Sequence, residues 1–152
     1  MGHPQIRRAQ TSDAAEMARL SGELGYPMSA DEMRARLGQL LPDAHHFIAV
    51  AYDAGDERLL GWMHVEHRTS LDAGDRAELM GLVVDGSVRR RGTGRALVDA
   101  AERWAQSQGL TALTVRSNVT RELSHPFYEA LGYVREKTQH VYRKRFRGSA
   151  SD

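Results

Sequence analysis

The chain has 152 residues, of which 41% are hydrophobic and 27% charged, and it contains no cysteine. This composition is typical of a folded globular protein and the length suits one domain, so we expect a single domain over residues 1–152. The lack of cysteine excludes a disulfide framework, a thiolate metal site and a cysteine nucleophile. The formal net charge of +1 gives no general attraction to nucleic acid or to a membrane surface.

The N-terminus lacks a basic segment followed by an apolar core, as a signal peptide would have. No apolar stretch approaches the roughly 20 residues that a membrane helix needs. We therefore expect a cytoplasmic protein that does not bind a membrane.

Local signals place the elements in chain order. Asp13 with Glu16, and Ser29 with Glu32, have the spacing of capping boxes at the start of helices. Apolar alternation, helical spacing and turn residues then give the other boundaries. We expect strands over residues 5–9, 47–52, 59–67, 78–84 and 110–116, helices over 13–25, 29–41, 93–108 and 126–131, a polar loop over 68–76, and two last strands within 133–147 around Lys137 and Thr138.

This order predicts an α+β fold with a mixed, mostly antiparallel sheet of about seven strands and about four helices. The strand–helix–strand unit over residues 78–116 should make a parallel, right-handed crossover.

A glycine-containing loop links the strongest predicted strand to the longest predicted helix. The first turn of a helix leaves backbone N–H groups unpaired and carries partial positive charge, so it favours an anion such as a phosphate. Gly92 and Gly94 allow close approach to the backbone, and three arginines precede them: Arg89, Arg90 and Arg91. A dinucleotide fingerprint would need glycine where Leu97 stands, and no Gly-Lys-Ser/Thr motif exists. On these residues alone, a flexible turn that caps a helix explains the pattern equally well.

The wider context resembles the GNAT superfamily of N-acetyltransferases. Leu82-Val83-Val84, four spacer residues and Arg89-x-x-Gly92-x-Gly94 are similar to its acetyl-CoA signature. Asn118 at the end of a strand and the segment from Pro126 to Tyr133 resemble its second conserved region, and the predicted element order is that of its three-layer fold. The resemblance covers the chain from about residue 5 to residue 146.

The resemblance implies direct transfer of the acetyl group of acetyl-CoA to a primary amine in a ternary complex. It assigns acetyl-CoA binding to Leu82, Val83, Val84, Arg89, Arg90, Arg91, Gly92, Thr93, Gly94, Arg95 and Asn118. The backbone of residues 82–84 would pair with pantetheine, and the N–H of Val84 would donate to the thioester oxygen.

Two catalytic roles follow from the same resemblance. Tyr128 matches the tyrosine that protonates the departing thiolate, and Glu78 occupies a position from which some members supply the general base. His64 and His67 are alternative bases, because imidazole titrates in a suitable range. We assign no metal, since His45, His46 and His125 have no partners at metal-ligand spacing.

The sequence indicates the acceptor of the acetyl group less clearly than it indicates the donor. Acidic residues in the first two helices and the 68–76 loop favour a small cationic amine, such as an aminoglycoside or a polyamine, although solvated helices carry such residues routinely. The alternatives are a peptide or protein N-acetyltransferase and a non-catalytic acyl-CoA sensor. A nucleic-acid partner is disfavoured because no broad basic face with interleaved aromatics is present. The resemblance also suggests a homodimer.

Overall fold

The computed structural model describes residues 3–87, 92–116 and 124–148. The chain divides into two compact units, Met1–Arg116 and Ser117–Asp152, and we describe each by itself.

The first unit is built on a five-stranded sheet in the order β1-β2-β3-β4-β5. The strands are β1 (Gln5–Arg8), β2 (His46–Tyr52), β3 (Leu59–Ser70), β4 (Gly74–Val84) and β5 (Leu113–Val115). Strands β1 to β4 pair antiparallel, whereas β5 pairs parallel to β4 after a helical crossover. The mixed sheet and the α+β class are therefore confirmed, as is the parallel crossover.

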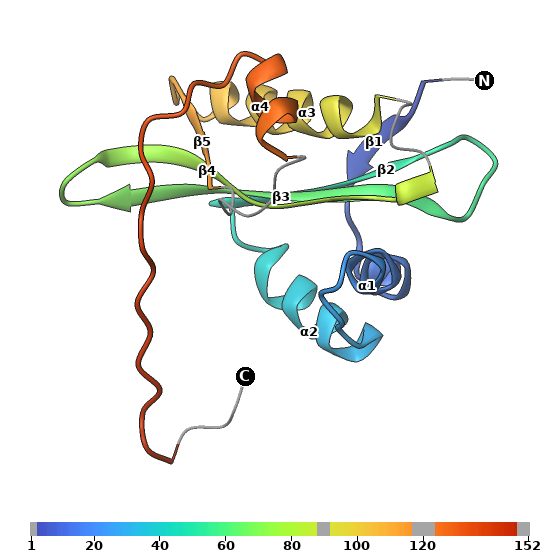
Figure 1. Cartoon of the computed structure of the whole chain (residues 1–152). Coiled ribbons are helices and arrows are strands. Elements are labelled where there is room, and N and C mark those ends of the chain that lie inside the picture. Colours follow the sequence, from blue (N-terminus) through green and yellow to red (C-terminus); the bar gives the residue numbers. More distant parts are fainter. Residues whose placement is uncertain (1–2, 88–91, 117–123, 149–152) are drawn as a thin grey trace. The chain divides into compact units, whose positions relative to one another are not determined.

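Helices cover both faces of this sheet. Helices α1 (Ala14–Glu23) and α2 (Ala30–Leu40) lie on one face and α3 (Thr93–Ser107) lies on the other, as Figure 1 shows. A 3-10 turn, Thr11–Asp13, precedes α1, and the second unit contains α4 (Ser124–Ala130). Under α1 and α2 the apolar core consists of Ala9, Ala14, Met17, Ala18, Leu20, Met33, Leu37, Ile48, Val50, Leu59 and Val83. Burial of these side chains on one face of the sheet fixes the register of the strands.

One capping box is confirmed and the other is wrong. The amide of Glu32 donates to the Ser29 hydroxyl at 3.0 Å, and the amide of Ser29 donates to the Glu32 carboxylate at 3.1 Å. Asp13 instead accepts from the amide of Gln10 at 2.8 Å, which closes the 3-10 turn. Glu16 is bonded to Arg19 and to the amide of Leu59 on β3, so a tertiary contact replaces the expected local one.

The expected loop over residues 68–76 is also wrong, because β3 and β4 continue through it as a hairpin. The side chains paired across this hairpin are polar, so the segment lacks the alternation of apolar and polar residues that predicts a strand. The Thr69 hydroxyl donates to Asp75 at 2.6 Å, and Arg76 donates to the Ser70 hydroxyl at 3.0 Å. Such pairs stabilise a hairpin as apolar pairs do, so the strands extend beyond the apolar signal.

The two last strands are not present among residues 133–148, and the described strands number five, not seven. The turn expected at Lys137 and Thr138 has neither glycine nor asparagine to adopt the positive φ of a tight hairpin turn. The segment is also rich in like charges, which oppose pairing within one hairpin.

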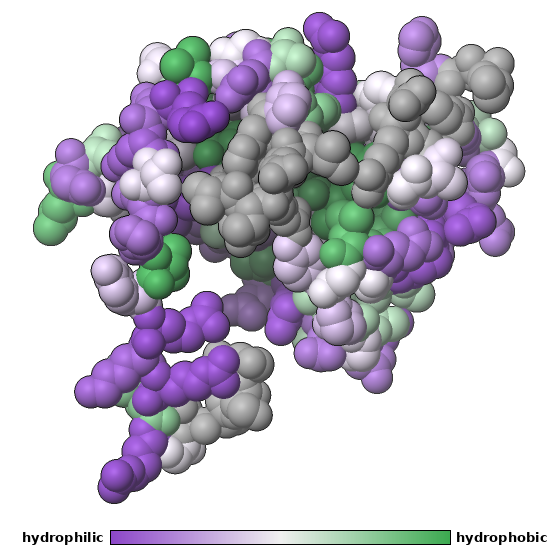
Figure 2. Space-filling view, viewed as in Figure 1, coloured by the Kyte–Doolittle hydropathy of each residue, from purple (hydrophilic) through white to green (hydrophobic). Residues whose placement is uncertain are grey.

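The surface agrees with the composition. Hydrophilic side chains cover most of the face in Figure 2, with apolar side chains visible between them. Within the described part of the chain, no helix combines the length and apolarity required to cross a bilayer.

Candidate active site

A β-bulge interrupts β4 at Met80. His64 of β3 is paired with Gly81, and Val65 is paired with Leu79, so Met80 is an extra residue on β4. A bulge reverses the alternation of the strand, which re-aims the side chains and amides that follow it. The bulge lies beside the predicted pantetheine segment, residues 82–84, and the sequence pattern gave no sign of it.

Beyond the bulge, one edge of β4 is open. Strand β5 pairs with β4 only at Ala77, Glu78 and Leu79, so among the described residues 80–84 have no neighbour on that side. An open strand edge presents backbone N–H and C=O groups to an extended ligand. Pantetheine carries two amides, and residues 80–84 offer them a strand to pair with.

The direction of the amides along this edge follows from one bond. The amide of Asp85 donates to the carbonyl of Leu60 at 2.8 Å, so it points toward β3. Because backbone groups alternate along a strand, Val83 also points toward β3, whereas Leu82 and Val84 point toward the open edge. A Cβ added to Gly61 of β3 would lie 2.6 Å from the carbonyl oxygen of Val83, which agrees with this direction. The Val84 amide therefore has the orientation that an oxyanion donor needs.

The N-terminus of α3 forms the second part of the site. Gly92 caps it with φ of 77°, in the left-handed region that favours glycine. The first intrahelical bond runs from the amide of Ala96 to the carbonyl of Gly92, so the amides of Thr93, Gly94 and Arg95 have no partner within the helix. The Thr93 side chain is fully buried, and its hydroxyl has no hydrogen-bond partner among the described residues. A buried hydroxyl without a partner beside free amides fits a phosphate oxygen.

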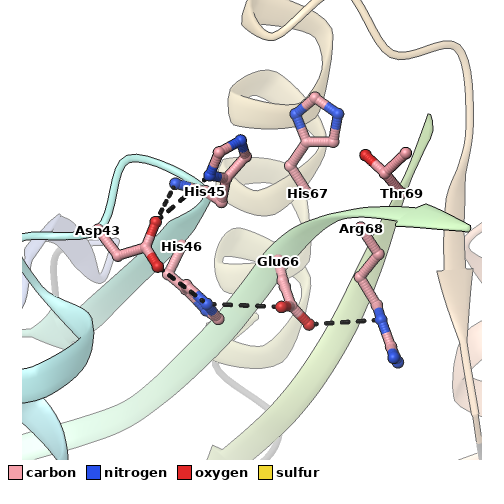
Figure 3. A pocket seen from close by; sticks show the side chains of 7 residues that line it. All are labelled: Asp43, His45, His46, Glu66, His67, Arg68 and Thr69. Atoms are coloured by element: carbon pink, nitrogen blue, oxygen red, sulfur yellow. Dashed lines mark hydrogen bonds and ion pairs between the residues drawn. The ribbon is translucent and has the colours of Figure 1, made fainter.

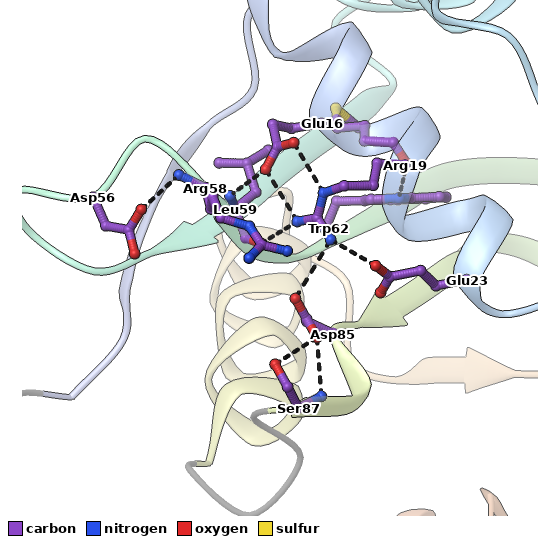
Figure 4. Close-up of polar contacts among 10 residues, drawn as sticks. Glu16, Arg19, Glu23, Asp56, Arg58, Leu59, Trp62, Asp85 and Ser87 are labelled. Atoms are coloured by element: carbon purple, nitrogen blue, oxygen red, sulfur yellow. Dashed lines mark hydrogen bonds and ion pairs between the residues drawn. The ribbon is translucent and has the colours of Figure 1, made fainter.

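The residues before this helix are held by an acidic anchor that sequence reasoning missed (Figure 4). Asp85 accepts from the amide of Ser87 at 2.9 Å and from its hydroxyl at 2.8 Å, and it lies 3.5 Å from Arg19 of α1. Burial acts to raise the pKa of Asp85, but these hydrogen bonds and the charge of Arg19 outweigh it and hold the pKa below its usual value. The Asp-x-Ser spacing of a side-chain turn was the available signal.

Glu78 is locked in an arginine cluster. It is only 3% exposed, and its carboxylate lies 3.2 Å from Arg68, 3.3 Å from Arg116 and 3.8 Å from Arg76. These three guanidinium groups come from β3, from the end of β5 and from β4 itself. The cluster therefore ties β5 to β4 at the point where the two strands separate.

The other predicted residues are in the second unit, outside the described residues or in the β3–β4 hairpin. Tyr128 is on α4 in the second unit, where its half-buried ring makes edge contacts with Phe127 and Tyr133 at 5.1 and 6.0 Å between centroids. Arg89, Arg90, Arg91 and Asn118 lie outside the described residues. His67 contacts Asp75 at 3.1 Å, and no group of metal-binding side chains occurs within the described ranges.

The acidic residues expected to attract a cation are largely occupied. The structure pairs Asp13 with Arg7, Glu16 and Glu23 with Arg19, Asp31 with Arg34, Glu32 with Arg36, and Asp75 with His67. Their charge is mostly neutralised within the protein, so this charge pattern contributes little to the choice of acceptor. Tyr26, in the link between α1 and α2, is exposed.

The bulged strand, its open edge and the free helix N-terminus suit an extended ligand that carries amides and a phosphate group. The sequence matches the acetyltransferase (GNAT) family over residues 13–133, a range that spans both units. It is 30% identical over 149 residues to an aminoglycoside N(6′)-acetyltransferase type 1 of Klebsiella aerogenes, covering 93% of this chain and 96% of that protein. It is 31% identical over 142 residues to the protein of the same name in Stenotrophomonas maltophilia, covering 91% and 90%.

Solved structures agree on the fold. The aminoglycoside N-acetyltransferase AAC(6′)-Iy in complex with CoA superposes with a TM-score of 0.84 at 23% identity, covering 96% of this chain and 98% of that one. An acetyltransferase of Trypanosoma brucei gives a TM-score of 0.76 at 26% identity, covering 93% and 99%.

The chain belongs to the acetyltransferase (GNAT) family. It is an N-acetyltransferase that moves the acetyl group of acetyl-CoA to an amine of a small molecule. The geometry of its first unit suits this co-substrate, with an open strand edge for pantetheine and free amides plus an unpaired hydroxyl for phosphate.

Proposed function

We propose that the acceptor is a primary amine of an aminoglycoside. The observation that carries this proposal is the match, over nearly the whole of both chains, to two relatives named aminoglycoside N(6′)-acetyltransferase. A family likeness alone would leave any small amine open, so the substrate class rests on these two proteins.

In this proposal the first unit holds acetyl-CoA along β4 and at the start of α3. The edge-facing groups of Leu82 and Val84 pair with pantetheine, while Val83 stays in the ladder with β3. The pyrophosphate lies at the amides of Thr93, Gly94 and Arg95 and accepts from the Thr93 hydroxyl, next to the left-handed turn at Gly92. The other residues predicted to bind acetyl-CoA are Arg89, Arg90, Arg91 and Asn118.

Two further roles remain predictions. Tyr128 is proposed to protonate the departing thiolate, because a phenol titrates only modestly above a thiol. Glu78 was predicted as the general base. Its three arginine contacts favour an alternative role in holding β5 against β4, since they engage both oxygens of the carboxylate.

The substrate proposal is tested by measuring thiol release from acetyl-CoA with a panel of amines. The central comparison is between an aminoglycoside with a 6′-amine and an aminoglycoside with a hydroxyl at that position. We expect acetylation of the 6′-amine of the first aminoglycoside and no acetylation at the 6′ position of the second. A polyamine, an amino sugar and a peptide with a free N-terminus complete the panel. Turnover with one of these and none with either aminoglycoside would refute the proposed acceptor while leaving acetyl transfer intact.

The homodimer and the cytoplasmic location suggested by the sequence also stay predictions. Light scattering of the purified chain tests the first, because a dimer doubles the mass of 17.0 kDa.

A further inference from the structure

Two histidines lie in contact beside the bulge. His64 of β3 is paired with Gly81, the residue that follows Met80 on β4. Its Nε2 lies 2.9 Å from Nδ1 of His46 on β2, and the two rings are 5.1 Å apart. The Trp62 indole on the same face of β3 donates to a carbonyl of α1, so these rings lie on the face that α1 and α2 cover.

His46 connects this pair to a solvent-facing hollow. Its Nε2 lies 3.5 Å from Glu66 and 3.8 Å from Asp43. Figure 3 shows His46 between the two carboxylates, in a pocket also lined by His45, His67, Arg68 and Thr69. A continuous chain of polar groups thus runs from the strand pair beside the bulge to the surface.

The contacts of His46 favour one pair of tautomers. Because carboxylates lie beside Nε2 of His46, we assign the proton of that ring to Nε2, so that Nδ1 of His46 accepts from Nε2–H of His64. The Nδ1 atom of His64 is then an acceptor, and it has no partner among the described residues. The His64 side chain is only partly buried.

We propose that His64 and His46 form a proton relay that carries the proton of the acceptor's ammonium group from the bulge in β4 to solvent. The ammonium N–H bond breaks and an Nδ1–H bond forms on His64, directly or through one water. The Nε2 proton of His64 passes to Nδ1 of His46, and the Nε2 proton of His46 passes to Glu66 or to water. One proton enters and one leaves, so the neutral amine gains the lone pair it needs to attack the thioester.

The surroundings support this role for His64. Burial, and then the charge that His46 carries when protonated, lower the pKa of His64 to about 4. The His64 ring therefore does not hold two protons, and a proton can bind Nδ1 only as the Nε2 proton passes on to His46. The titratable groups nearest in the register are His46 from β2, Glu66 from β3 and Glu78 from β4, and the contacting faces of α1 and α2 are apolar. Glu78, the other candidate base, is held by three arginines.

The test compares His64→Gln, His46→Gln and Glu78→Gln with a matched control, His45→Gln, whose ring lines the pocket outside the relay. We expect either relay variant to lower kcat near neutral pH by about 10²-fold. The double variant should be no slower than either single one, because the two residues act in series. The deficit should shrink as pH rises above the pKa of the amine, since an amine that is already neutral needs no relay. His45→Gln should retain the kcat of the unaltered protein.

The pH dependence separates a relay from a structural role, which would lower activity at every pH. A kcat of His64→Gln and His46→Gln equal to that of the control would overturn the proposal, as would a deficit that does not change with pH. A pH-dependent deficit confined to Glu78→Gln would restore Glu78 as the base. If His64→Gln does not fold, His46→Gln interrupts the same relay, with the melting temperature and its rise with acetyl-CoA as controls. The relay rests on acetyl transfer, and the assay uses whichever amine of the panel is turned over, so failure of the aminoglycoside proposal is recorded separately.

Discussion

Replacing Thr93 with valine should raise the stability of the free protein and weaken its affinity for acetyl-CoA. The two side chains have nearly the same shape, so the fully buried site at the start of α3 keeps its packing. What changes is the hydroxyl, which is buried without a partner among the described residues. Burial of an unpaired polar group is unfavourable, whereas a hydroxyl bonded to a phosphate oxygen is favourable.

The magnitudes follow from these two states. Removing an unsatisfied buried hydroxyl should increase the free energy of unfolding by about 1–3 kcal/mol. In a chain of 152 residues each kcal/mol raises the melting temperature by roughly 2–4 °C. Losing a hydrogen bond to a charged group costs about 1.5–3 kcal/mol of affinity, which is a rise in the Kd for acetyl-CoA of about 10- to 150-fold.

Thermal unfolding with and without acetyl-CoA measures both effects, and titration calorimetry gives the Kd directly. The matched control is Thr93→Ser, which keeps the hydroxyl and loses a methyl group, so its affinity should stay close to that of the unaltered protein while its stability falls. A lower melting temperature for Thr93→Val together with an unchanged Kd would refute the reasoning. That result would mean that the hydroxyl is bonded within the protein and does not bind phosphate.

Three other predictions concern separate parts of the site and fold. Gly92→Ala should destabilise the protein by about 1–2 kcal/mol because φ is 77° there, while Gly22→Ala inside α1, where an added Cβ meets nothing, should stabilise it by about 0.5–1 kcal/mol; thermal unfolding of both compares them. Tyr128→Phe should lower kcat by about 10²-fold and leave the melting shift with acetyl-CoA unaltered, and an unchanged kcat would remove Tyr128 from the mechanism. Burial acts to raise the pKa of Asp13, but its bonds to Arg7 and to a backbone amide outweigh this and lower it. Its stabilising contribution is therefore complete above about pH 5 and is lost as pH falls through 4 and below, so denaturant titrations of Asp13→Asn should show a smaller loss of stability over that range than the unaltered protein.

The parts of the fold that could be predicted are those with local causes. The capping box of Ser29 and Glu32 needs only residues three apart, and α2 begins where it predicts. The failure at Glu16 has the opposite origin, since its partner on β3 is 43 residues away in the sequence. No local rule distinguishes a carboxylate that caps its own helix from one that binds a distant strand.

The candidate site divides in the same way. The free amides at the start of α3 follow from the Gly92 turn and were predicted. The arginine cluster around Glu78 was not, because it joins β3, β4 and the end of β5, and only the pairing of these strands brings the four side chains together. The contact between His46 and His64 has the same cause, as it depends on the register that pairs Ile48 with His64.

The bulge at Met80 explains why the predicted oxyanion donor is available at all. Before the bulge, Glu78 lies on the face of α1 and α2, paired with Glu66. In a regular strand, residues an even number of positions apart have the same orientation. The amide of Val84, six residues after Glu78, would then point toward β3 and be bonded in the ladder. The extra residue reverses this order. It turns the Val84 amide to the open edge, sends Val83 into the core beneath α1, and leaves Glu78 among its arginines. One inserted residue therefore separates a strand that only builds the sheet from a strand that also has an amide free for the proposed thioester.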